Sequence, residues 1–208
     1  MMQQVHFRVD PLVQARLGST LYRARGGDAY YHLHGTMRHV FGNEDIHTYY
    51  LNPSQMQVSA YTDLDRDVIL DRVAHTHEGL VTGLQVEEVP LVRTGDRVRL
   101  AVRVQPLETF DYRTWSRTQF VTNDLTAWLL HRTRRALTVD PTTISCETHT
   151  EGRVYRRGEH RTLGNLSVTV ADYLFEGRVE NSDSFMFMLR RGLGKGRSFG
   201  FGMPRFQS

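Results

Sequence analysis

Gly192-Leu-Gly-Lys-Gly-Arg-Ser-Phe-Gly-Phe-Gly202, near the end of the sequence, holds five glycines in eleven residues. Glycine lets the backbone take positive φ angles and approach another backbone closely. Bare N–H groups beside Lys195 and Arg197 suit a phosphate. A dinucleotide fingerprint needs a strand before the loop and a helix after it, whereas here a helical stretch precedes the glycines. The order argues against a nucleotide cofactor and leaves an anion-binding loop or a glycine-rich turn before a last strand.

Length and composition allow one large domain or two domains of about 100 residues. The 208 residues contain no run of 18 apolar residues, so no transmembrane helix is expected. The start, Met-Met-Gln-Gln-Val-His, lacks the apolar core of a signal peptide. Cys146 is the only cysteine, which precludes an internal disulfide and favours a cytoplasmic location. The ten histidines show no zinc-ligand spacing, so we expect neither a metal nor a cofactor.

Charge is distributed unevenly along the chain. Residues 1–90 hold 7 Arg against 11 Asp and Glu, a net charge of −4. Residues 91–208 hold 18 Arg and one Lys against 12 acidic residues, a net charge of +7. A basic second half is expected if that half binds a polyanion. A solvated surface rich in arginine is the alternative interpretation.

The first half predicts the order β-α-β-β-α-β. Strands are expected at 4–9, 47–51, 56–61 and 83–89, and helices at 30–41 and 63–74. The first helix is indicated by an apolar stripe: Tyr30, Leu33, Met37, Val40 and Phe41. In the second helix we expect Leu64, Val68 and Val73 to face inward.

The second half predicts the same order after a linker at 90–95. Strands are expected at 97–104, 142–150 with 153–157, 166–180 and 199–206, and helices at 123–136, capped by Asn123, and from Ser182 to Arg191. In the strand 97–104, Arg97, Arg99 and Arg103 alternate with apolar residues. The chain is therefore expected to be an α+β protein with two tandem ferredoxin-like (RRM-like, βαββαβ) domains, 1–90 and 91–208.

Three patches in this order resemble the CasE-type CRISPR RNA-processing endoribonucleases of Cascade complexes, members of the RAMP superfamily. The first is Tyr31-His-Leu-His-Gly-Thr-Met-Arg-His-Val-Phe41, which is similar to a first-helix pattern of that family. The second is Gly95-Asp-Arg-Val-Arg-Leu-Ala-Val-Arg-Val-Gln-Pro106. The third and most specific is Phe175-Glu-Gly-Arg-Val followed by Leu189-Arg-Arg and the glycine-rich stretch. One departure is Val104-Gln-Pro106, where the family often has Ala-Asn-Pro.

The resemblance implies two ferredoxin-like domains and metal-independent cleavage of a CRISPR repeat transcript at the 3′ base of a stem-loop. The products would carry a 5′-OH and a 2′,3′-cyclic phosphate, and the crRNA would be retained for assembly. The implied partners are the repeat RNA hairpin and other subunits of a Cascade-like complex, with no membrane and no small-molecule cofactor. A second interpretation keeps the same fold as a non-catalytic RNA-binding subunit of a CRISPR ribonucleoprotein.

Metal-independent RNA cleavage needs a base for the 2′-OH proton, an acid for the 5′-oxygen and positive charge at the phosphate. Tyr31 and His34 are three residues apart and share a helix face, with Arg38 between them in angle. Imidazole is suited to proton transfer near neutral pH. The hypothesis is His34 as general acid or base and Tyr31 orienting or activating the 2′-OH. The alternative is a boundary histidine and an aromatic at the edge of the core.

A basic hairpin is expected at Arg153-Val-Tyr-Arg156-Arg157-Gly-Glu-His-Arg161, and the family resemblance gives it the role of holding the RNA stem. Clustered arginine suits double-stranded RNA, which is recognised largely through shape and phosphates. A solvated charged turn is the alternative. The predicted RNA-binding residues are Arg38, His39, Arg153, Arg156, Arg157, Gly194, Lys195, Gly196, Arg197 and Ser198. Trp128 is expected in the core; Tyr112 and Trp115 would stack on a base or anchor a loop.

Overall fold

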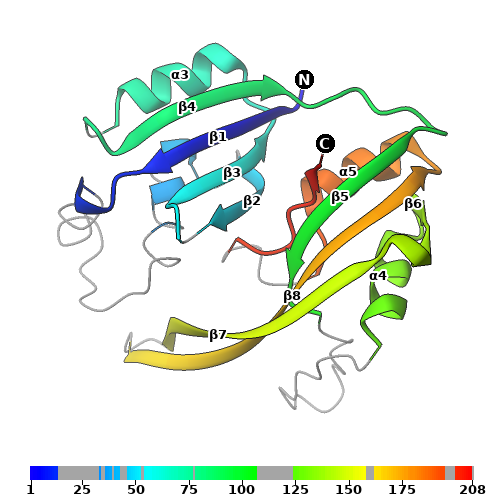
Figure 1. The fold of residues 1–208 in the computed structure, drawn as a ribbon. Helices are drawn as coiled ribbons and strands as arrows, with labels where there is room; N and C mark the ends of the chain where they lie inside the picture. Colours follow the sequence, from blue (N-terminus) through cyan, green and yellow to red (C-terminus); the bar gives the residue numbers. More distant parts are fainter. Residues whose placement is uncertain are drawn as a thin grey trace. The chain divides into compact units, whose positions relative to one another are not determined.

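The computed structural model describes residues 1–13, 33, 36–38, 40–42, 46–52, 54–76, 78–106, 124–157, 162–194 and 200–207, with the backbone alone at 152–157 and 162–167 (Figure 1). Within these residues the fold is α+β, with two antiparallel sheets. This confirms the fold class expected from the sequence. No helix in these ranges is long and apolar enough to cross a membrane.

The first sheet contains four strands in the order β2-β3-β1-β4, which is the strand order of a ferredoxin-like domain. Its elements are β1 (Gln3–Val9), β2 (Ile46–Asn52), β3 (Gln57–Thr62), α3 (Arg66–Ala74) and β4 (Val81–Glu88). β1 is a central strand, because it pairs antiparallel with β3 from Gln3↔Thr62 and with β4 from Gln3↔Glu88. Its odd-numbered residues are buried, as the alternation in the sequence predicts.

The core of this sheet is completed by helical backbone at residues 33, 36–38 and 40–41 and by α3. Leu33, Met37, Val40 and Phe41 are at most 3% exposed and pack with Phe7 and its strand neighbours. In α3 the predicted inward position of Val68 is wrong: Val68 is 40% exposed and Ile69 is fully buried. The other two predicted positions, Leu64 and Val73, are partly buried and pack against this core, so the prediction was wrong at one of its three positions.

The second sheet has the order β6-β8-β5-β9, and β7 also pairs with β8. Its elements are β5 (Arg97–Val104), α4 (Leu125–Thr133), β6 (Leu137–Val139), a 3-10 turn (Pro141–Thr143), β7 (Ser145–Arg157), β8 (Thr162–Val179), α5 (Ser182–Arg191) and β9 (Arg205–Phe206). β6 and β7 together occupy the place of the second strand in a βαββαβ order. The sequence predicted neither β6 nor the continuity of β7 through Gly152.

Both helices of the second unit cover one face of its sheet. Trp128 of α4 stacks on Tyr173 of β8 at 6.1 Å, and Phe185 of α5 lies 6.1 Å from Phe206 of β9. Even-numbered residues of β5 face these helices and are buried, whereas Arg97 and Arg99 on the opposite face are exposed. Trp128 is therefore a core residue, as expected, at 6% exposure.

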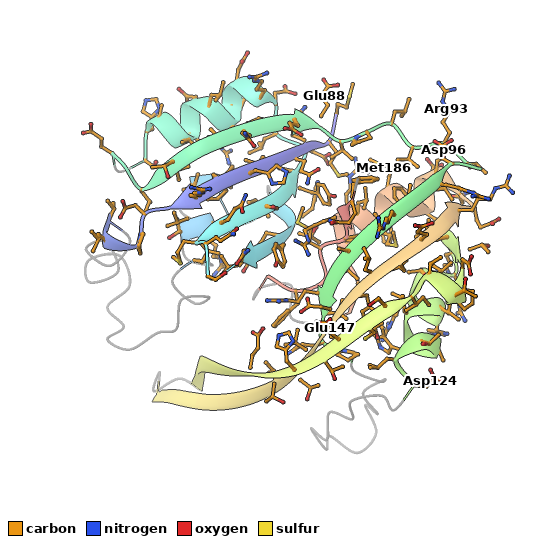
Figure 2. The ribbon with its side chains drawn as sticks, in the orientation of Figure 1. Glu88, Arg93, Asp96, Asp124, Glu147 and Met186 are labelled. Carbon is orange, nitrogen blue, oxygen red and sulfur yellow. The ribbon has the colours of Figure 1, made fainter. Side chains whose placement is uncertain are left out.

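Helix starts in this unit are fixed by side-chain caps. The N-cap of α4 is Asp124, labelled in Figure 2, whose carboxylate accepts a hydrogen bond of 2.8 Å from the backbone N–H of Ala127. The cap was predicted one residue too early, at Asn123, which lies outside the described residues. Asn181 caps α5 by accepting from the N–H of Ser184 at 2.7 Å. Short polar side chains at these positions satisfy N–H groups that the helix itself leaves unpaired.

The chain divides into two compact units. The first contains Met1–Pro90, Gly152–Ser167 and Ser198–Gly200. The second contains Leu91–Glu151, Val168–Arg197 and Phe201–Ser208. The distal parts of β7 and β8 thus group with the first ninety residues, so the simple division into 1–90 and 91–208 stays a proposal.

Candidate functional site

The stretch 30–41 contains the proposed catalytic residues of the sequence, and its described residues 33, 36–38 and 40–41 are helical. Its described part has a buried stripe, and Arg38 is exposed on the other side. The segment ends where the N–H of Gly42, at φ +82°, donates to the carbonyl of Arg38 at 2.9 Å. Tyr31, His34 and His39 lie outside the described residues. Of the residues predicted here, the structure therefore places Arg38 alone, at the surface.

The glycine-rich loop begins and ends in fixed positions within the second unit. At its start, the N–H of Gly192 donates to Met188 at 2.7 Å and closes α5. At its base, the N–H of Leu193 donates to the carbonyl of Gly202 at 2.8 Å. The N–H of Gly202 donates in turn to the carbonyl of Arg103 in β5 at 2.6 Å. The two ends of the loop are thus joined to each other and to the sheet.

Two of its glycines are required by close backbone contact. A Cβ on Gly202, at φ +88°, would lie 2.4 Å from the carbonyl oxygen of Leu193. A Cβ on Gly194, at φ +77°, would lie 3.2 Å from the carbonyl oxygen of Gln105 and 3.4 Å from the Trp128 ring. These contacts explain glycine at both positions by packing. Lys195, Gly196, Arg197 and Ser198 lie outside the described residues.

The predicted basic hairpin lies at the distal ends of β7 and β8, which run side by side as a two-stranded ribbon in Figure 1. The pairing of β5 with β8 ends at Val104↔Ala171, so residues 162–170 of β8 lie beyond β5. Arg153, Arg156 and Arg157 fall within the last five residues of β7. The structure therefore places the backbone of all three on the ribbon, and residues 158–161 lie outside the described residues.

Four charged or titratable side chains meet where the ribbon leaves the sheet. Arg103 donates to both carboxylate oxygens of Asp172, from Nε at 2.8 Å and from Nη2 at 3.0 Å. Its Nη1 lies 3.4 Å from Oε1 of Glu151, which also pairs with Nε2 of His149 at 2.8 Å. Nδ1 of His149 lies 3.7 Å from Asp172. Sequence reasoning saw Arg103 as one member of a basic face and missed its acidic partners.

Two neighbouring groups of the second unit, the half-buried Cys146 and the core residue Tyr173, have raised pKa values. Burial raises the pKa of the Cys146 thiol, and the charge of Asp172 acts in the same direction. Burial is also the main cause that raises the pKa of the Tyr173 phenol, and the neighbouring Cys146 raises it further. The Tyr173 hydroxyl donates to the carbonyl of Leu125 at 2.9 Å. Both groups are therefore neutral near pH 7. No group of three or more His, Cys, Asp or Glu side chains in the described ranges is arranged to hold a metal ion.

Comparison with solved structures shows the same fold along the whole chain. A CRISPR endoribonuclease Cse3 bound to a 19-nucleotide RNA is 19% identical, with a TM-score of 0.70 over 100% of this chain and 99% of that one. Thermus thermophilus Cse3, bound to an RNA representing a pre-cleavage complex, is 18% identical with a TM-score of 0.68 over 100% and 99%. Cas6e from Escherichia coli K-12 is 14% identical with a TM-score of 0.57 over 99% and 98%.

Sequence comparison gives the family. A search of curated proteins finds no match. The family described as CRISPR associated protein matches residues 6–204. This range runs from within β1 to the residue before β9, so it contains the strands β2 to β8, the ribbon and the glycine-rich loop. It agrees with the resemblance carried by the three sequence patches. The chain therefore belongs to this family of CRISPR-associated proteins, with the fold of the CasE-type structures Cse3 and Cas6e.

Proposed function

We propose that this protein is an endoribonuclease that cleaves CRISPR repeat RNA without a metal ion. The observation that carries the proposal is the family match over residues 6–204. It is supported by the likeness to Cse3 structures that hold RNA. Two described features suit the binding of RNA. One is the ribbon, which carries three arginines, and the other is the glycine-rich loop, whose ends are hydrogen-bonded to each other and to β5. The net charge of +7 in residues 91–208 acts in the same direction.

The proposed reaction is an internal transesterification. The ribose 2′-OH attacks the adjacent phosphorus, the P–O5′ bond breaks, and the products are a 2′,3′-cyclic phosphate and a 5′-OH. One proton leaves the 2′-OH and one joins the 5′-oxygen, so no water is consumed. His34 is proposed as general acid or base and Tyr31 as the group that orients or activates the 2′-OH. Arg38, exposed on the same helical segment, would stabilise phosphate charge.

Binding of the RNA is assigned to the second half of the chain. Arg153, Arg156 and Arg157 on the ribbon would contact phosphates of the stem, where shape and backbone are recognised rather than base edges. Lys195 and Arg197 in the glycine-rich loop would contact the strand near the cleaved phosphate. The product crRNA would stay bound, and the protein would join other subunits of a Cascade-like complex.

The decisive experiment incubates the protein with a labelled repeat hairpin from its own CRISPR locus in EDTA. We expect one cut at the 3′ base of the stem and a cyclic-phosphate end. His34→Ala should lower the rate by about 10²- to 10⁴-fold, the usual contribution of a proton-transfer group. His32→Ala is the matched histidine control, and Tyr30→Phe is the control for Tyr31→Phe. A loss of less than about threefold in His34→Ala would remove its proposed role.

Two further outcomes separate enzyme from binder. A 2′-deoxy substitution at the cut site should abolish cleavage and leave binding intact, because the nucleophile alone is removed. Tight binding of the unmodified hairpin without cleavage would instead identify a non-catalytic RNA-binding subunit with the same fold. Cleavage that requires added Mg²⁺ would contradict the metal-independent mechanism.

A further inference from the structure

Arg103 differs from the other arginines on its face of β5. Arg97 is exposed, and Arg99 is 47% exposed with a loose 3.8 Å pair to Glu176. The side chain of Arg103 is 16% exposed and faces two carboxylates, Asp172 and Glu151. A guanidinium that already donates two parallel hydrogen bonds to one carboxylate has few N–H groups left for a phosphate. Its position indicates a role other than direct RNA contact.

The side chain of Arg103 joins three strands at the root of the ribbon. Asp172 is its cross-strand partner in β8, one residue after the last β5 pair at Ala171. Glu151 lies in β7 immediately before the ribbon segment that carries the three basic residues. Beyond this point β8 pairs with β7 and no longer with β5. The cluster therefore lies where β8 passes from its pairing with β5 into the ribbon.

The backbone of the same residue holds the glycine-rich loop. The carbonyl of Arg103 accepts the N–H of Gly202 at 2.6 Å, and Gly202 accepts the N–H of Leu193 at 2.8 Å. One residue of β5 is thus bonded through its main chain to the base of the loop and through its guanidinium to the base of the ribbon. Displacement of Arg103 would disturb both elements.

We propose that Arg103 is a positioning residue whose guanidinium orients the arginine ribbon for the RNA, acting through Asp172 and Glu151. The inference rests on the RNA-binding role proposed above for the ribbon. Arg103 itself does not contact the RNA. Lysine cannot replace it, because an ammonium group cannot bond both oxygens of Asp172 and reach Glu151 in the same geometry.

Hydrogen exchange tests the positioning without RNA. In Arg103→Lys we expect faster amide exchange in residues 162–170 of β8, while residues 171–178, which pair with β5, keep their protection. Arg99→Lys, on the same face of the same strand, is the matched control and should change neither range. Unchanged exchange at 162–170 in Arg103→Lys would overturn the proposal even if the protein binds and cleaves the repeat.

A double-mutant cycle tests the link to binding. Arg103→Lys should weaken hairpin binding about tenfold, within the range shown by coupled residues. In the Arg156→Ala, Arg157→Ala background the same change should cost less than about twofold, because the ribbon arginines are already gone. Equal losses in both backgrounds would mean that Arg103 acts independently of the ribbon and would overturn the proposal.

Two controls separate a positioning role from a folding defect. The first measures the fraction of protein that is active, and the second uses another variant. Asp172→Asn leaves Arg103 in place but removes its charged partner, and it should reproduce the exchange and binding effects of Arg103→Lys. If affinity per active molecule is unchanged in both variants, Arg103 is only a stabilising residue and the proposal is wrong. Failure of the wild-type protein to bind any repeat hairpin would instead refute the proposed function, while the exchange experiment would still decide the positioning.

Discussion

Gly202 offers the sharpest test of how the glycine-rich loop is held. In Gly202→Ala the new Cβ would lie 2.4 Å from the carbonyl oxygen of Leu193, whereas real Cβ atoms essentially never come within 3.0 Å of such an atom. The backbone must therefore move by at least 0.6 Å, the difference between these two distances. Two hydrogen bonds lie in the path of that movement, one to Leu193 and one to Arg103.

The size of the effect follows from a matched comparison. Alanine at a φ of +88° costs about 1–3 kcal/mol in backbone strain. Gly95→Ala, at a φ of +97° in the same unit, carries similar strain, but its Cβ meets only the end of the Arg178 side chain at 3.7 Å. Each disrupted hydrogen bond adds about 1 kcal/mol. Gly202→Ala should therefore destabilise the second unit by about 2 kcal/mol more than Gly95→Ala.

Urea unfolding followed by tryptophan fluorescence measures this difference. The chain has two tryptophans, so a Trp115→Phe background leaves Trp128, in the core of the second unit, as the reporter. A local reporter is needed because two units need not unfold together. Equal unfolding midpoints and slopes for the two alanine variants would refute the argument that close backbone contact requires glycine at 202.

Three further predictions address caps and buried groups. Asp124→Ala should destabilise the second unit by about 1 kcal/mol by removing the α4 cap, and Asp124→Asn should retain most of the stability in the same urea assay. Tyr173→Phe should cost about 1 kcal/mol, because the bond from its hydroxyl to Leu125 is lost and the ring packing on Trp128 is kept. Because burial raises the pKa of Cys146 in the folded state, the folded state is fully favoured below the ordinary thiol pKa, and this contribution is lost as pH rises through the raised value. Cys146→Ala should therefore flatten the fall in stability above about pH 9, measured by unfolding at each pH. An unchanged fall would contradict the prediction.

Local patterns were sufficient to predict most elements of both units. The alternation in β1 and β5 and the stripe of Leu33, Met37, Val40 and Phe41 were all confirmed, because burial on one face follows directly from residue period. In the second helix Leu64 and Val73 face the core as predicted, but Val68 does not. Val68 and Ile69 are both apolar, and the sequence does not show which of them faces the sheet. Tertiary packing selected Ile69.

Features that depend on distant residues were missed. β7 continues through Gly152 because it pairs with β8, and local breakers do not report such pairing. The last strand is only Arg205–Phe206, since Gly200 and Gly202 take positive φ and Pro204 has no N–H to donate. Arg103 was read with Arg97 and Arg99 as one basic face, because its partners Asp172 and Glu151 are 69 and 48 residues away.

The second unit departs from a plain βαββαβ order at one place, and the departure explains how the ribbon forms. A single second strand would pair with β8 along the same span as β5 does. Here β6 pairs with residues 177–179 of β8, and the 3-10 turn at Pro141–Thr143 separates it from β7. β7 is thereby free to follow β8 beyond Ala171, where β5 ends. Splitting one strand in two thus extends a hairpin carrying Arg153, Arg156 and Arg157 without changing the buried face of the sheet, and it leaves the root of that hairpin to be held by polar contacts, which Arg103 supplies.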